Sequence, residues 1–186
     1  MISILGILFL GFFLIVLFVI AVYNSLVRIR NEVKNSWAQI DVQLKRRHDL
    51  IPNLIETTKG YMQHERDTLE AVTKARQQAV NIQGSLADKA NIENMLSQTL
   101  KSLFAVSEKY PELKANQNFL DLQEELTATE NKIGFARQYY NDAVMSLNNK
   151  IEVFPSNIIA GVFNFKAGEF FAVSDAAERA VPQVKF

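Results

Sequence analysis

The chain of 186 residues carries 20 Lys and Arg against 20 Asp and Glu, and this neutral balance argues against bulk nucleic-acid binding. It has no cysteine, which excludes disulfides, thiol redox chemistry and cysteine-based metal sites. Beyond an apolar N-terminal run, about 164 residues remain, enough for one domain with its own core.

The apolar run Ile2–Val22 contains no charged residue, and Ser3 is its only polar side chain. At about 1.5 Å per residue the run is roughly 30 Å long, which matches the hydrocarbon core of a bilayer. A core helix of a water-soluble protein would carry a polar face. We therefore predict a transmembrane anchor over residues 1–23, followed by a cytoplasmic helical domain over residues 24–186.

A cleavable signal peptide is the alternative to a retained anchor. No Lys or Arg precedes the apolar run, the run exceeds the roughly 7–15 residues of a signal core, and Ala21-Val22-Tyr23 is a poor cleavage site. We therefore expect a retained single-pass anchor. Arg28, Arg30 and Lys34 follow the run, and an excess of bases marks the cytoplasmic flank. This predicts an external N-terminus and a cytoplasmic C-terminal domain.

After the anchor, apolar or neutral residues recur every three or four positions over residues 26–79, which is typical of one helical stripe. Pro52 interrupts the stripe, and a proline inside a helix costs about 3 kcal/mol because it removes a hydrogen bond and clashes with the preceding turn. The helix either kinks there and continues, or ends near His48 with Asp49 capping a new helix. Because the phase of the stripe is unchanged, we expect one long kinked helix over residues 24–81, continuous with the anchor.

Two further helices are expected after the polar stop at residues 81–85. The first has an apolar seam over residues 92–110, and Pro111 both ends it and opens the next helix. The second keeps a heptad-like seam over residues 119–154 and stops at Pro155. Helices with such seams and short connections predict an antiparallel bundle, with the longer first helix forming a stalk above the membrane.

Smaller features complete the expected fold. Gly134 lies inside the last long helix, where glycine costs about 1 kcal/mol relative to alanine, and we expect it to admit another helix closely. Residues 156–161 are expected to form a short turn capped by their first two side chains, and residues 164–168 a loop. A last helix is predicted over residues 167–180, with residues 181–186 frayed.

The two histidines do not form a metal site in this arrangement. On one continuous helix, His48 and His64 would lie about 160° apart, at about 100° per residue. Thr68 stands where a His-Glu-x-x-His motif beginning at His64 needs its second histidine. No Gly-rich phosphate loop, nucleophile elbow or paired carboxylates are recognisable. We predict no catalytic residue, no cofactor and no metal; an acid–base role for His48, Asp49 or His64 is the enzymatic alternative.

A basic run beside Pro52 is the candidate partner-binding surface. A kink exposes polar groups, so anionic lipid or an acidic protein could bind there. Lys45 lies about 34 Å beyond the span, so headgroup contact requires a bend or tilt. The alternative is a solvated face whose bases pair within the bundle with Asp142 or Glu130. The candidate residues are Lys45, Arg46, Arg47, His48, Asp49 and Asn53.

Aromatic residues mark two further places. Trp37 lies about 22 Å beyond the span, which favours a core anchor over an interfacial tryptophan. Five phenylalanines gather near the C-terminus, where they either close the end of the bundle or form a hydrophobic surface for a membrane or partner. They are Phe154, Phe163, Phe165, Phe170 and Phe171.

Long ordered runs of this sequence resemble the LemA family. They are Tyr23–Val27, Asn31–Leu54, Lys59-Gly60-Tyr61, His64-Glu65, Ala136–Val144, Phe154–Ala160 and Val181-Pro182. The resemblance implies a bacterial inner-membrane protein with one N-terminal span and a cytoplasmic four-helix bundle, and it brings no catalytic residue. Relatives in the family include a magnetosome-membrane protein, and members resemble accessory proteins of membrane proteases.

Three functions follow as hypotheses. An anchor, a long amphipathic bundle and no convergent chemistry favour a non-enzymatic scaffold or adaptor, with the bilayer as one partner through residues 2–22 and a protein or a second copy as another. Seams longer than one bundle needs would also suit an oligomerising, membrane-remodelling protein. An accessory factor of a membrane protease is the third. No nucleic acid or small-molecule substrate is expected.

Overall fold

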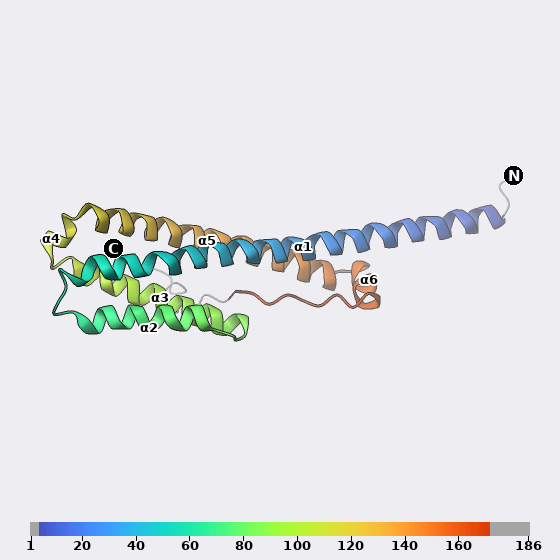
Figure 1. Ribbon diagram of the computed structural model, residues 1–186. Coiled ribbons are helices and arrows are strands. Elements are labelled where there is room, and N and C mark those ends of the chain that lie inside the picture. The colour runs from blue at the N-terminus through green and yellow to red at the C-terminus, as the bar shows by residue number, and fades with distance from the viewer. Residues whose placement is uncertain (1–3, 172–186) are drawn as a thin grey trace, which may run out of the picture. The chain divides into compact units, whose positions relative to one another are not determined.

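The structure, a computed structural model, describes residues 4–171, and within this range its regular elements are all helices (Figure 1). The predicted all-α fold is confirmed. The helices are α1 (Ile4–Lys59), α2 (Arg66–Asn81), α3 (Leu86–Ser107), α4 (Pro111–Lys114), α5 (Gln117–Glu152) and α6 (Ser156–Val162).

Helix α1 runs unbroken from the apolar segment through Pro52, so the predicted continuity past Tyr23 is confirmed. The alternative of a helix end near His48 is wrong. Among the described residues, α1 is the one helix long and apolar enough to cross a membrane. Large apolar side chains between Ile7 and Ile20 are exposed, for example Phe9 at 73%, as expected of a surface that faces lipid.

The expected helix over residues 24–81 is wrong at its far end, because α1 stops at Lys59 and α2 begins at Arg66. Gly60 follows directly, and glycine is a poor helix former. Two backbone bonds close the turn, from the N–H groups of Tyr61 and Met62 to the carbonyl of Thr58, at 3.0 and 2.9 Å. Met62 is fully buried within the turn. The spacing of apolar residues therefore continues across the turn, and this spacing alone does not show that the chain reverses direction.

The chain divides into two compact units. The first, here the anchor unit, combines the residues up to Ile40 with Ala136–Phe170; the second, the bundle unit, contains Asp41–Phe135 and Phe171. Helices α1 and α5 contribute to both units, whereas α2, α3 and α4 belong to the bundle unit alone.

The bundle unit is a four-helix bundle made from the end of α1, α2, α3 and the first part of α5. Each element, including the short α4, supplies residues to one apolar core, whose members include Leu54, Val72, Leu103, Leu113 and Phe119. A capping box starts α3, in which Ser85 and Asp88 bond each other's backbone N–H groups. The chain therefore reverses at Ile82–Ser85, as the polar stop predicts.

Pro111 opens a separate short helix, α4, before α5 begins at Gln117. The close approach expected at Gly134 is wrong, since a Cβ built there would meet no atom within 4 Å. The helix therefore tolerates this glycine without using its small size.

In the anchor unit, α6 and the end of α5 pack against the part of α1 expected to form the stalk. Val22 and Leu26 are buried with Ala160 in a small apolar cluster. Trp37 is half-buried against Tyr140, with ring centroids 5.6 Å apart in an edge-on contact, which fits the predicted core position.

The segment after α6 turns back along α5. Asn148 bonds both backbone groups of Gly168, at 2.8 and 3.1 Å, and the Tyr140 hydroxyl donates to the carbonyl of Glu169 at 3.0 Å. A Cβ at position 168 would lie 3.3 Å from Val144, so glycine permits this close approach. Residues 167–171 are not helical, which contradicts the start of the predicted last helix; the rest of that helix and residues 181–186 lie outside the described residues.

Candidate functional site

The structure separates the six predicted partner-binding residues on α1 into two groups. Arg47 and His48 are buried. The other four, Lys45, Arg46, Asp49 and Asn53, are exposed.

Arg47 forms the centre of a buried ion-pair network in the bundle unit. Its side chain is fully buried and pairs with the carboxylates of Glu93 on α3 and Glu130 on α5. It also donates to the Ser97 hydroxyl at 2.8 Å, and Ser97 donates to Glu130 at 2.8 Å. Three helices are therefore joined through one guanidinium, whose planar set of donors suits several acceptors at once.

His48 joins the same network through Glu93, with its Nε2 donating to the carboxylate at 3.0 Å. Burial by itself would raise the pKa of Glu93. The hydrogen bond from His48 and the nearby charge of Arg47 outweigh that effect and hold this pKa below its ordinary value of 4.5. Glu93 therefore stays ionised at neutral pH, and Arg47 has a fixed negative partner inside the bundle.

The expected pairing of the basic run with Glu130 is thus confirmed, through Arg47. Arg46 forms a further, exposed ion pair with Glu125 at 2.5 Å. Sequence reasoning missed Glu93. Its signal is a carboxylate in the buried stripe of α3, between Ala90 and Leu96. A charged residue at a buried position of a helix needs a partner of opposite charge, and such a residue can be recognised by its spacing.

Pro52 has a partner in α2 that the sequence did not reveal. Because proline has no N–H, the carbonyl of His48, four residues earlier, lacks its usual helical donor. Arg76 supplies one instead, with its Nε donating to that carbonyl at 2.7 Å. The polar group expected to be exposed by the proline is therefore bonded to the neighbouring helix, and α2 is tied to α1 at this point.

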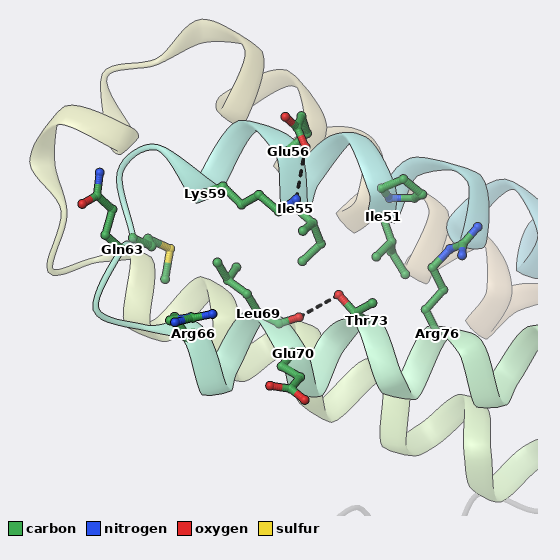
Figure 2. Close-up of a pocket in the computed structure, with 12 residues that line it drawn as sticks. Ile51, Ile55, Glu56, Lys59, Gln63, Arg66, Leu69, Glu70, Thr73 and Arg76 are labelled. Carbon is green, nitrogen blue, oxygen red and sulfur yellow. Dashed lines mark hydrogen bonds and ion pairs between the residues drawn. The ribbon is translucent and has the colours of Figure 1, made fainter.

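A groove of about 750 Å³ lies between the end of α1 and α2 in the bundle unit. In Figure 2, Ile51 and Ile55 of α1 point toward Leu69 of α2, while Arg66 and Arg76 lie toward opposite ends. Acidic side chains, Glu56 and Glu70, share the rim with these bases and with Lys59. The groove therefore has an apolar floor between charges of both signs.

The three residues of the enzymatic alternative are not brought together. His48 is buried against Glu93, whereas Asp49 and His64 are exposed, His64 in the turn after α1. The expected placement of both histidines on one helix is therefore wrong. Within residues 4–171, no group of three or more His, Asp or Glu side chains is placed to hold a metal ion.

Comparison with known proteins finds one matching family model and several similar proteins. The LemA family model matches residues 36–186. Protein LemA of Metamycoplasma hominis is 28% identical over 137 residues, which cover 74% of this chain and 63% of that protein. Magnetosome protein MamQ 2 of Paramagnetospirillum magneticum is 22% identical over 84% of this chain and 66% of its own length. Magnetosome protein MamQ of Magnetospirillum gryphiswaldense is 20% identical, with 87% and 70% covered. The chain thus spans slightly less than two thirds of the first two relatives.

Proposed function

The chain belongs to the LemA family, and from this premise we propose that it is a membrane-anchored, non-enzymatic scaffold or adaptor. It presents its bundle unit at the cytoplasmic face of the bacterial inner membrane, with the N-terminus outside. The observation that carries the proposal is α1, one helix that contains both the apolar span and a wall of the bundle. A bound partner would thereby be coupled mechanically to the bilayer.

The bases beside the span support the proposed orientation. Arg28, Arg30 and Lys34 lie within about three turns of Val22, and such bases favour the cytoplasmic side. Because the chain has no cysteine, single-cysteine variants test this directly. We expect a cysteine at Val42 to react with an impermeant maleimide only after the cells are opened. Equal labelling of intact and opened cells would contradict the proposed orientation.

The partner surface combines the groove with the exposed residues beside it. Lys45, Asp49 and Asn53 are exposed on α1, and Pro52 lines the groove. Arg47 and His48 are excluded from direct contact because their side chains are buried in the network. The proposed occupant is a protein segment whose apolar side chains contact Ile55 and Leu69. Its charged side chains, of both signs, pair with the charges on the rim.

Photocrosslinking in native membranes tests the adaptor proposal. A photoreactive amino acid at Thr73, which lines the groove, should give discrete adducts with a partner protein. The same substitution at Thr127, an exposed threonine of α5 in the same unit, is the matched control. The triple variant Lys45→Ala, Asp49→Ala, Asn53→Ala should weaken the adducts. Identical adducts at Thr73 and Thr127, or none at Thr73, would contradict the proposal.

A second candidate is membrane remodelling through self-association. It is favoured by Phe135 on α5, whose side chain is 73% exposed, and by Leu120, which is 41% exposed on the same helix of the bundle unit. Sedimentation of the full chain in mild detergent should then show concentration-dependent oligomers that Phe135→Ser abolishes. A monomer at every concentration would remove this candidate.

A further inference from the structure

A short segment of the anchor unit exposes an unusual amount of apolar surface. Residues 153–165, between Glu152 and Lys166, contain no charged side chain. The exposed side chains include Val153 at 58%, Phe154 at 74%, Ile158 at 55%, Val162 at 73% and Phe163 at 50%. Single exposed hydrophobic residues are ordinary, but a contiguous group marks a surface that is normally covered.

The position of this segment indicates what covers it. The Phe163 ring contacts the Tyr23 ring at a tilted angle, with ring centroids 4.7 Å apart, and Ala160 is buried with Val22. A groove of about 430 Å³ is lined by Phe18 of α1 together with Phe154. Phe18 lies four residues inside the apolar run, or about 6 Å before its end at Val22. Phe154 therefore lies beside the end of the span.

We propose that residues 153–163 are embedded in the interface of the same bilayer that α1 crosses, with Phe154, Ile158 and Val162 against lipid acyl chains. The proposal rests on the membrane span assigned under the proposed function. It adds a second point of membrane attachment, more than a hundred residues after the first in sequence.

The backbone of the segment is suited to a medium without water. In lipid, each unsatisfied N–H or C=O costs several kcal/mol, so a buried segment must supply its own hydrogen bonds. This segment does so for several N–H groups at the start and end of α6. The N–H to O=C bonds are Asn157 to Val153 at 2.9 Å, Ile158 to Pro155 at 3.3 Å, Phe163 to Ile159 at 3.1 Å, Asn164 to Gly161 at 3.2 Å and Phe165 to Ala160 at 2.9 Å.

Basic side chains border the segment where headgroups would lie. Lys150 lines the same groove as Phe154, Lys166 follows the uncharged run, and the Arg30 guanidinium lies 5.1 Å from the centre of the Phe165 ring. Apolar side chains flanked by bases are typical of segments that lie in a membrane interface. A single helix is free to rotate about its axis, whereas a second interfacial contact fixes its rotation and tilt.

Depth measurements on the full chain test the proposal. Nitroxide labels are placed on single cysteines at Phe18, Phe154 and Val162, and on Val42 as the control, since Val42 is an exposed valine (62%) of the bundle unit. The probe membrane is a vesicle of phosphatidylethanolamine and phosphatidylglycerol. We expect the labels at positions 18, 154 and 162 to collide more with oxygen than with a water-soluble nickel chelate. The label at position 42 should show the reverse.

The outcomes separate the span from the second attachment. Water-like values at positions 154 and 162 with a lipid-like value at 18 overturn the inference and leave the anchor intact. A water-like value at 18 overturns the span itself. Labels at 154 and 162 shielded from both reagents, with spin–spin broadening between chains, show that a second copy covers the patch and also overturn the inference. Ile158 replaces position 154 or position 162 if either variant loses helical circular dichroism.

Discussion

The anchor unit and the bundle unit bury different chemistry although α1 and α5 contribute to both. The bundle unit combines an apolar core with a buried guanidinium bound by carboxylates from two other helices. The anchor unit combines a small aliphatic cluster, aromatic contacts such as Trp37 with Tyr140, and side-chain bonds to the backbone, and it also buries Arg137. The bundle unit gains specificity from an oriented charge network, whereas the anchor unit depends more on shape and aromatic contact.

The largest effect is expected from Arg47→Met, which leaves Glu93 as a buried charge. Because breaking a buried pair strands the remaining ion, the free energy of unfolding should fall by about 3–5 kcal/mol. Denaturant unfolding of the full chain in detergent measures it. The exposed ion pair of Arg46 with Glu125 provides the control. Arg46→Ala should lower the free energy of unfolding by no more than about 1 kcal/mol. Adding Glu93→Leu to Arg47→Met should recover part of the loss, and no recovery would contradict the stranded-charge explanation.

Truncating one fully buried leucine in each unit should cost about 2–5 kcal/mol, because each change removes apolar contacts and leaves a cavity. Leu26→Ala affects the anchor unit and Leu54→Ala the bundle unit, and both side chains have zero exposure. Hydrogen exchange should show faster exchange around residues 156–165 in the first variant and around residues 66–81 in the second. If each change loosens both regions equally, the two units are a single cooperative body and the contrast fails.

Arg76→Ala should destabilise the bundle unit by about 1.5–3 kcal/mol, because the carbonyl of His48 loses a charged donor. In a Pro52→Ala background the restored N–H of residue 52 can bond that carbonyl. The same Arg76→Ala change should then cost clearly less, so a double-mutant cycle measures the coupling. An unchanged cost would show that Arg76 acts through packing alone.

Acid should weaken the bundle unit specifically. The pKa of Glu93 is lower in the folded chain than its ordinary value of 4.5, so ionised Glu93 contributes stability that is fully present above that value. This contribution is lost as pH falls below about 4.5 and through the lower folded pKa. Unfolding midpoints measured from neutral pH downward should show this loss. Glu93→Gln should be less stable at neutral pH and should flatten that part of the profile; an unchanged profile would exclude Glu93 as its origin.

The smallest effect is a gain in stability. Gly134→Ala should raise the free energy of unfolding by about 0.5–1 kcal/mol, because alanine is the better helix former and its Cβ meets no atom within 4 Å. Ala128→Gly, at an exposed position of the same helix, is the reverse control and should lower stability by a similar amount. A loss in Gly134→Ala would indicate a contact partner for this face outside the single chain.

Much of the fold was predictable, and the errors have identifiable causes. The ends of helices at Asn81 and near Pro111 and Pro155 follow local turn chemistry, which a few neighbouring residues determine. The turn at Gly60 was missed because Met62 is buried there and preserves the apolar spacing of the helices on either side. The basic run predicts either a partner surface or pairing within the bundle, and its pattern does not show that Arg47 is the one base directed into the core, facing a carboxylate 46 positions away in the chain.

The sequence by itself determined the charge-free run at the N-terminus, the helical class and the family, because these depend on composition, short spacings and ordered motifs. Only the tertiary structure decided which of three adjacent bases is buried, that Arg76 bonds the carbonyl left open by Pro52, and that Phe154 and Phe18 line one groove. Each of these depends on which side chains meet across helices that lie far apart in sequence, and no local pattern specifies that pairing.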